Sequence, residues 1–303
     1  MVSIITVNYN QTEVTLDFLE SINKQDFKNI EVIVVDNASE NSPEKIIRQS
    51  YPEVKFIRSE RNLGFAGGNN LGIAKASGDY LFFVNNDTII PDNTIHRLVN
   101  WLINHPETGM ISPLIYYFDH QEMLQYAGST EVDTLTGRNS SIGYHEYWKL
   151  TDTVKPTAYP HGAAMMIPRS VIDQVGVMPE NFFLYYEELD WCTQIRDQGF
   201  EARVDHGAYI WHKESVSTGK NSPLKTYFMT RNRILYMRRN VKGIKRALFM
   251  LFFTFISFPK NLLTHFLKGE FKLAQAFSAG VFWNLFNGKT SPTLGYKYNG
   301  LNR

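Results

Sequence analysis

The stretch Gly78-Asp79-Tyr80-Leu81-Phe82-Phe83-Val84-Asn85-Asn86-Asp87-Thr88 decides the fold expected of this chain. Its apolar run, residues 80–84, is typical of a central strand that is buried on both faces. Two amides, a carboxylate and a hydroxyl follow at once, so they would lie at the carboxyl end of that strand, where open α/β sheets bind ligands. A carboxylate at this edge can hold a hard divalent cation, which in turn can clamp a diphosphate.

Strands and helices alternate on both sides of this stretch, which favours a doubly wound, largely parallel α/β sheet. The chain is expected to be helical after Pro223. The segment 117–160 has no clear period, which leaves open whether it forms a meander or loops at the sheet edge. The pattern predicts further strands at 2–9, 30–35, 54–58, 110–115, 163–168 and 208–212. It predicts helices at 13–24, 91–104 and 189–198, and another helix that begins at residue 43. A Gly/Asn-rich loop at 64–70 is expected to lead into a short helix that ends near residue 76.

The 303 residues, 43% hydrophobic and 20% charged, suit one large globular domain with an appendage. We expect a catalytic-type domain at 1–220, with halves at about 1–115 and 116–220, and a helical region at 221–303. Residues 215–269 hold eleven Lys and Arg and no acid, although the net charge of the chain is only +1. This asymmetry predicts a basic surface on the C-terminal part that faces an anionic partner.

The cysteine count and the N-terminus indicate a compartment. Cys192 is the only cysteine, which excludes an intramolecular disulfide. Residues 1–9 have the pattern of a strand and lack a basic n-region and a cleavage site. We therefore expect a protein of the reducing cytoplasm.

Each polar cluster, taken alone, also has an ordinary structural interpretation. Asp36 suits a turn, and a lone His212 is more often a packed histidine than a ligand. The Gly64–Gly68 loop matches neither the dinucleotide-binding nor the Walker pattern. Arginines such as Arg231 would by default lie on a solvated helix face.

The acidic cluster at 187–190 is more informative. Five apolar or aromatic residues, 182–186, precede it. Burial against them would raise a glutamate's pKa and suit it to general-base catalysis. The alternative is a helix N-terminus enriched in acids, which explains Glu187 and Asp190 but not the aromatic run.

In order along the chain, these motifs resemble the family-2 inverting GT-A glycosyltransferases, in particular their bacterial rhamnosyltransferase-like branch. The resemblance covers roughly residues 2–240 and rests on 5–10, 34–39, 62–70, 85–87, 186–191, 211–212 and 227–233. Asn85 departs from it, because the first position of the DxD motif is usually Asp. Only Asp87 then offers a carboxylate there, which raises the importance of His212.

The resemblance implies a role for each matching residue. Glu188 would be the catalytic base, and Asp87 with His212 would hold Mg²⁺ or Mn²⁺. Residues that would contact the donor nucleotide are Val7, Asn8, Tyr9, Asn10, Asp36, Asn37, Gly64, Phe65, Gly68, Asn69, Asn85 and Asn86. Residues that would position the sugar or acceptor are His161, Gly162, Glu187, Asp190, Trp191 and Arg231.

The activity implied is inverting transfer of rhamnose or a hexose from a dTDP- or UDP-sugar to a glycan or lipid-linked saccharide in cell-wall or other cell-surface polysaccharide synthesis. The alternative is a catalytically degenerate GT-A module that still binds nucleotide-sugar. A nucleotidyltransferase would need a basic loop near the N-terminus, and residues 8–12 contain no Lys or Arg. A nucleic-acid partner is disfavoured because the basic residues are interleaved with an apolar run.

That apolar run, residues 247–258, is shorter than the roughly 20 residues needed to cross a bilayer. Basic residues flank it on both sides, which favours a helix lying on the inner, anionic leaflet of the cell membrane as a peripheral anchor. A second aromatic helix at 271–286 can join it. A helical hairpin packed on the catalytic domain, or a homo-oligomer interface through these helices, are the alternatives.

Overall fold

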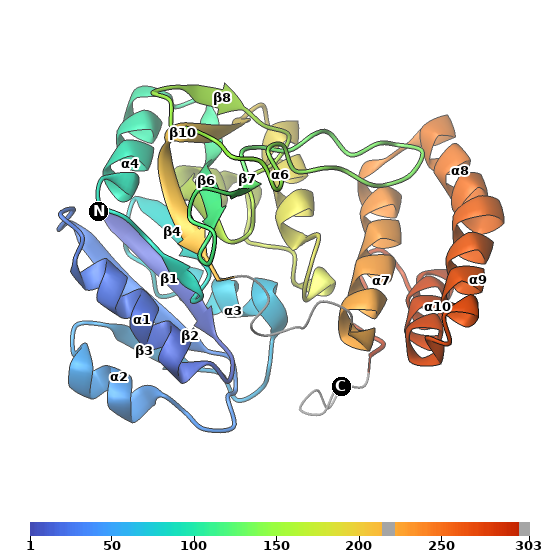
Figure 1. Ribbon diagram of the computed structural model, residues 1–303, viewed down its shortest axis with the longest axis horizontal. Helices are drawn as coiled ribbons and strands as arrows, with labels where there is room; N and C mark the ends of the chain where they lie inside the picture. The colour runs from blue at the N-terminus through green and yellow to red at the C-terminus, as the bar shows by residue number, and fades with distance from the viewer. Residues whose placement is uncertain (214–221, 297–303) are drawn as a thin grey trace.

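One mixed sheet forms the centre of the protein (Figure 1). The computed structural model describes residues 1–213 and 222–296. Within these residues the strands are β1 (Val2–Asn8), β2 (Ile30–Asp36), β3 (Lys55–Arg58), β4 (Tyr80–Val84), β5 (Thr88–Ile89), β6 (Thr108–Tyr117), β7 (Leu124–Tyr126), β8 (Val154–Pro156), β9 (Ala164–Pro168) and β10 (Glu201–His212). They lie in the order β3-β2-β1-β4-β9-β6-β10-β5, with β7 beside β6 and β8 beside β10.

The predicted central strand, β4, lies inside this sheet. It runs parallel to β1, which is parallel to β2, and β2 is parallel to β3. On its other side β4 pairs with the antiparallel β9, and β10 runs parallel to β6. The expected largely parallel α/β sheet is confirmed.

Helices cover both faces of the sheet because residues of a strand alternate between the faces. Ile4 packs in the core that contains residues of α1, α2 and α4, and Ile5 packs in the core that contains residues of α3, α5 and α6. These helices are α1 (Thr12–Asn23), α2 (Glu44–Ser50), α3 (Gly64–Ile73), α4 (Thr94–Asn104), α5 (Arg169–Val175), the 3₁₀ turn η1 (Glu180–Phe182) and α6 (Glu187–Asp197).

The Gly/Asn-rich segment 64–70, expected to be a loop, is the first part of helix α3. Its glycines are poor helix formers, but they allow the helix to pack directly on β1. A Cβ on Gly68 would lie 2.9 Å from Val7 Cγ1, and one on Gly72 would lie 2.4 Å from Ile5 Cγ2. Close packing therefore outweighs low helix propensity here.

The segment 117–160, which the sequence left open, forms short strands and connecting loops. β7 pairs with β6, and β8 pairs with β10. The expected domain boundary at 220–221 and the last residues of the helical region, 297–303, lie outside the described residues.

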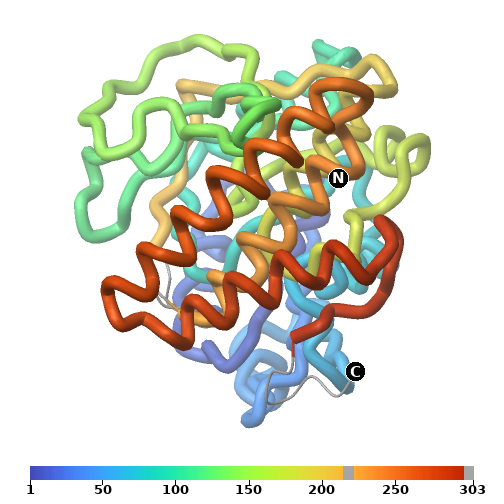
Figure 2. Tube along the Cα trace, turned by 90° about the vertical axis from the view of Figure 1, so that its right-hand side faces the viewer, coloured from blue at the N-terminus to red at the C-terminus, as the bar shows by residue number. Residues whose placement is uncertain are grey.

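The C-terminal helices pack as a separate layer beside α6 (Figure 1). They are α7 (Pro223–Asn240), α8 (Gly243–Phe252), the π-helical turn η2 (Phe253–Ser257), α9 (Phe258–Leu267) and α10 (Phe271–Phe286). Figure 2 shows α8, η2 and α9 as one continuous helix on the outside of the molecule.

This continuous helix corrects the expectation of an apolar segment too short to cross a bilayer. Gly243–Leu267 has 25 residues and contains an 18-residue stretch with a mean hydropathy of 1.5, enough by length and composition alone to cross a membrane. Pro259 does not end the helix, because it lies in the first turn of α9, directly after the π-helical turn. Proline has no backbone N–H to donate, and a wide turn of this kind tolerates the missing hydrogen bond.

Candidate functional site

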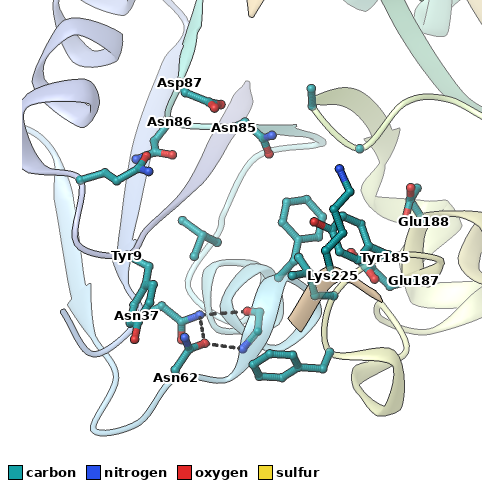
Figure 3. A pocket seen from close by; sticks show the side chains of 18 of the residues that line it. Tyr9, Asn37, Asn62, Asn85, Asn86, Asp87, Tyr185, Glu187, Glu188 and Lys225 are labelled. Carbon is teal, nitrogen blue, oxygen red and sulfur yellow. Dashed lines mark hydrogen bonds between the residues drawn. The ribbon is translucent and has the colours of Figure 1, made fainter. Parts of the chain in front are cut away.

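A cleft of about 410 Å³ opens at the carboxyl ends of β1, β2 and β4 (Figure 3). Parallel strands end at the same edge of a sheet, so residues from distant parts of the chain meet there. The loop before α6 and the start of α7 form the opposite wall. The lining residues are Val7, Tyr9, Gln11, Asn37, Asn62, Gly64, Phe65, Asn85, Asn86, Asp87, His161, Gly162, Ala163, Phe183, Leu184, Tyr185, Glu187, Glu188, His212, Leu224 and Lys225.

Most residues expected at the nucleotide line this cleft, and the others lie outside its lining. Asn37 accepts a hydrogen bond from the Leu63 N–H and donates to Asn62 Oδ1 and the Gly64 carbonyl, so it fixes the start of α3. The expected residues in the lining are Val7, Tyr9, Asn37, Gly64, Phe65, Asn85 and Asn86. Those outside the lining are Asn8, Asn10, Asp36, Gly68 and Asn69.

The buried pair of Asn8 and Asp36 supports the lining from behind. Asn8 Nδ2 donates to Asp36 Oδ1 at 2.8 Å and to Ser39 Oγ at 3.1 Å. The other carboxylate oxygen of Asp36, Oδ2, is buried without a hydrogen bond among the described residues, and Arg58 Nε lies 3.8 Å from it.

Asp87 and His212 face each other at the end of the sheet. His212 Nε2 lies 3.1 Å from Asp87 Oδ1, and both side chains are buried. That carboxylate oxygen has no hydrogen bond among the described residues. His212 Nδ1 lies 2.7 Å from Oε1 of Gln125 in β7.

This arrangement fits a divalent cation. A buried carboxylate oxygen without a donor beside an imidazole nitrogen is a ligand pair suited to Mn²⁺ or Mg²⁺. Adjacent ligands of an octahedral ion with bonds of about 2.1 Å lie about 3 Å apart, close to the 3.1 Å observed. The described residues hold no group of three or more His, Cys, Asp or Glu that could bind a metal. A cation here would therefore need further ligands from substrate or water.

Glu187 and Glu188 lie across the cleft from this edge (Figure 3). Burial raises the pKa of Glu188 to about 7. Burial, together with the charge of Glu188, raises the pKa of Glu187 well above its usual value. The Oε2 atoms of both side chains are buried without hydrogen bonds among the described residues. A carboxylate desolvated in this way is suited to accept a proton near neutral pH.

His161 and Gly162, expected near the sugar or acceptor, also line the cleft. Burial lowers the pKa of His161 to about 3, so the ring is neutral. A Cβ on Gly162 would lie 3.7 Å from Glu188 Cδ, so the glycine keeps the space beside that carboxylate open.

The loop that leads into Glu187 has an unusual backbone. Phe183, Tyr185 and Tyr186 all have positive φ, 68°, 69° and 73°. Such conformations are costly for residues with bulky side chains and occur mainly where the surrounding structure enforces them.

Two residues of α7 enforce this loop conformation. Nδ2 of the buried Asn232 donates to the carbonyls of Phe182, Leu184 and Tyr185 at 2.8–2.9 Å. Arg231 donates to the carbonyls of Asn181 and Phe182. We call this contact the carbonyl clamp, formed by Arg231 and Asn232.

Arg231 is therefore fully buried behind the wall of the cleft and does not line it. Its guanidinium lies 4.0 Å from the centre of the Trp283 ring, and burial lowers its pKa to about 10. The interpretation as a solvated helix face is wrong for this residue.

Asp190 and Trp191 also lie outside the lining. Asp190 is completely buried and forms a two-pronged ion pair with Arg239, with both N···O distances 2.9 Å. Trp191 packs edge-on against Phe83 and donates from Nε1 to the Gly176 carbonyl. Both residues hold α6 in place.

Lys225 is the main lining residue that the sequence did not indicate. It lies in the first turn of α7, and Figure 3 shows its side chain extending into the cleft between Asn85 and Glu188. Among the described residues its ammonium has no carboxylate partner, and it lies 6.0 Å from the Tyr185 ring centre. The sequence predicted only that the chain is helical after Pro223.

Comparison with known proteins identifies relatives over most of the chain. Residues 3–176 match Glycosyl transferase family 2. The low-salt glycan biosynthesis hexosyltransferase Agl10 of Haloferax volcanii is 30% identical over 250 residues, which cover 77% of this chain and 74% of that protein. The N-acetylglucosaminyl-diphospho-decaprenol L-rhamnosyltransferase of Mycobacterium tuberculosis is 22% identical over 243 residues, covering 72% and 78%.

Solved structures share the fold. The mannosyltransferase PcManGT from Pyrobaculum calidifontis, in complex with GDP-Man and Mn²⁺, matches with a TM-score of 0.60 and 17% identity over 94% of this chain and 87% of its own. S. aureus TarS in complex with UDP-GlcNAc matches with a TM-score of 0.59 and 18% identity over 92% and 80%. These neighbours identify the sheet and its helices as the GT-A fold.

Proposed function

This chain belongs to glycosyl transferase family 2, in its rhamnosyltransferase-like branch, and from that premise we propose an inverting sugar transfer at the cleft. The donor is a dTDP- or UDP-linked rhamnose or hexose. The acceptor is a hydroxyl of a glycan or lipid-linked saccharide in cell-surface polysaccharide synthesis. The names of the hexosyltransferase and rhamnosyltransferase relatives support this substrate class.

One observation carries the proposal. On one wall of a single cleft lies Glu188, a half-buried glutamate whose buried Oε2 has no hydrogen bond among the described residues, and on the other wall lies the Asn85–Asp87 edge with His212. A reaction that removes a proton on one side and releases an anionic leaving group on the other needs this separation of functions.

Glu188 acts as the base. Its ionised carboxylate takes the proton of the acceptor hydroxyl while that oxygen bonds to the anomeric carbon, and the bond from this carbon to the diphosphate oxygen breaks. The nucleoside diphosphate leaves with the bonding electron pair. A single displacement inverts the anomeric configuration, which is consistent with one carboxylate base and no separate carboxylate nucleophile.

Asp87 and His212 are the residues that would hold Mg²⁺ or Mn²⁺. A bound divalent cation would supply positive charge for the diphosphate that departs. Lys225 reaches into the same cleft from α7 and contributes a further positive charge. The neutral ring of His161 and the open space at Gly162 leave room for the sugar and acceptor beside Glu188.

The C-terminal helices attach the enzyme to the cytoplasmic face of the cell membrane. Large apolar side chains are exposed on them: Ile244, Leu248, Leu251, Phe255, Ile256, Leu263, Phe266, Leu267, Phe271, Phe282, Leu285 and Phe286. Basic residues, among them Lys245, Arg246, Lys260 and Lys268, lie in the same region. Apolar side chains beside basic ones suit an anionic leaflet.

We propose that the continuous helix Gly243–Leu267 lies along the membrane surface and does not span it. Phe249, Phe253 and Ser257 on one side of this helix are buried against the rest of the protein, so only the other side is available to lipid. Co-sedimentation with phosphatidylglycerol vesicles, and its loss in Phe255→Asp, would support this attachment. A dimer in sedimentation analysis without vesicle binding would support a homo-oligomer interface instead.

The test of the activity is release of nucleotide from a panel of UDP- and dTDP-sugars with Mg²⁺ or Mn²⁺, beside a Glu188→Gln variant. Metal-dependent turnover of one donor, lost in the variant and giving a product of inverted anomeric configuration, would support the proposal. Donor binding without transfer to any glycan or lipid-linked acceptor would favour the degenerate binding module.

A further inference from the structure

His212 has a different partner at each ring nitrogen, and the chemistry of these partners fixes where its proton lies. On one side Nδ1 lies 2.7 Å from Gln125 Oε1. On the other side Nε2 lies 3.4 Å from Asn85 Nδ2 and 3.1 Å from Asp87 Oδ1. Gln125, Asp87 and His212 are all at least 90% buried, so water does not compete with these contacts.

An amide oxygen only accepts hydrogen bonds and an amide nitrogen only donates them. Nδ1 must therefore carry a hydrogen to bond with Gln125 Oε1, and Nε2 must present its lone pair to Asn85. A neutral imidazole has one N–H, so both contacts assign the same tautomer. In this tautomer Nε2 and Asp87 Oδ1 point lone pairs at each other, and a divalent cation bound between or beside them relieves that repulsion.

We infer that Gln125 is a positioning residue that holds His212 in the Nδ1–H tautomer and so keeps Nε2 free to bind a divalent cation together with Asp87. The identity of that cation rests on the proposed function, whereas the tautomer does not. Outer hydrogen-bond partners of ligating histidines typically change metal affinity by about 10- to 100-fold when removed.

The fold places Gln125 for this task. It lies in the middle of β7, between Leu124 and Tyr126, which are both buried in the core. Because side chains of a strand alternate, Gln125 faces the other side, toward the end of β10 and His212. Among the described residues its only side-chain hydrogen bond is the one to His212.

The first test observes the proton directly in the wild-type protein. Long-range ¹H–¹⁵N NMR of the metal-free protein, labelled with ¹⁵N-histidine and recorded at pH 8.5, distinguishes the two ring nitrogens, and a His212→Gln variant identifies the signal. We expect a protonated Nδ1 and an unprotonated Nε2. A proton on Nε2, in a neutral or a cationic ring, would overturn the inference.

The second test measures binding of Mn²⁺, alone and with UDP, by electron paramagnetic resonance. Gln125→Leu removes the acceptor and should weaken Mn²⁺ binding about 10- to 100-fold. Gln125→Glu keeps an acceptor for Nδ1–H and should retain the affinity and the tautomer. The control is Gln25→Leu, which removes a buried glutamine that bonds to the Ile90 carbonyl and should leave Mn²⁺ binding unchanged.

The outcomes separate this inference from the proposed function. Equal Mn²⁺ affinity in Gln125→Leu and wild type, or no Mn²⁺ binding by the wild type, would overturn the role of Gln125. The expected tautomer and Mn²⁺ binding in a protein that transfers no sugar would instead contradict the proposed function and leave the role of Gln125 intact.

Discussion

Replacing Glu188 by glutamine is expected to stop sugar transfer and, at alkaline pH, to make the protein more stable. The two effects have one cause, because burial that raises the pKa of the carboxyl to about 7 also makes its ionised form costly in the folded state. Glutamine has nearly the same shape and never ionises, so it removes the base and the cost together.

The size of the stability effect follows from the shift in pKa. A rise from 4.5 to about 7 corresponds to about 3 kcal/mol of folding free energy at pH well above 7, since one pKa unit is worth about 1.4 kcal/mol. The Glu188 carboxyl stays protonated to a higher pH in the folded chain than in the unfolded chain. The protonated Glu188 carboxyl therefore makes its full contribution to the free energy of unfolding below pH 4.5, and this contribution is lost as the pH rises through about 7. Between pH 5 and pH 8.5 wild type should lose about 2 to 3 kcal/mol relative to the variant.

The assay is thermal unfolding of both proteins at pH 5 and pH 8.5, alongside steady-state transfer rates. The advantage of the Glu188→Gln variant in Tm should grow by roughly 4 °C between the two pH values. Its kcat should fall by about 100- to 10,000-fold, the usual contribution of a general base. Glu122→Gln, at an exposed position, is the control and should match wild type in both measurements.

Two results would refute this reasoning. A Tm difference that is the same at both pH values would mean that the carboxylate is not desolvated as the structure has it. A variant with wild-type kcat would mean that another group takes the proton of the acceptor.

Three further results are expected. In wild type, kcat/KM should rise with pH and reach half of its maximum near pH 7, because only ionised Glu188 accepts a proton; a flat profile from pH 5 to 9 would contradict this. Lys225→Ala should reduce kcat/KM for the donor by about tenfold, as expected when one charge-assisted contact is lost, and Lys225→Arg should restore most of it; equal losses in both variants would exclude a role of charge. Arg239→Leu should lower the free energy of unfolding in urea by about 3 to 5 kcal/mol, since it leaves the buried Asp190 carboxylate without its cation; a loss below about 1 kcal/mol would show that the side-chain amides of Gln194 and Asn240, which also donate to this carboxylate, are enough to stabilise it.

The sheet could be predicted because its central strands are continuously apolar. The runs 32–35 and 81–84 are apolar and buried on both faces, and burial of that kind leaves a direct mark on composition. Helix α3 could not be predicted from propensity, because the benefit of its glycines comes from contact with Val7 and Ile5 in another element. The long apolar helix was missed for a similar reason, since a proline usually ends a helix and the π-helical turn before Pro259 left no sequence signal.

Residues that line the cleft could be predicted where polar side chains follow a strand directly, as Asn85–Asp87 do. Lys225, which lines the cleft, and Gln125, which contacts His212, were missed, because each lies on a segment whose position depends on tertiary packing. The family motif at 231–233 led to Arg231, but a sequence does not reveal that an arginine bonds to backbone carbonyls behind a wall instead of to a ligand.

The carbonyl clamp limits how this protein can be divided. The loop that leads into Glu187 and Glu188 precedes α7 in the chain, yet Arg231 and Asn232 on α7 supply the donors for its carbonyls. A truncation just before α7, or a chimaera in which the helices come from a relative with a different α7, would leave these carbonyls unpaired and the positive-φ loop unsupported. Exchange of the helices α8–α10 between enzymes of this family should therefore be made after Asn240, so that α7 stays with the α/β domain it completes.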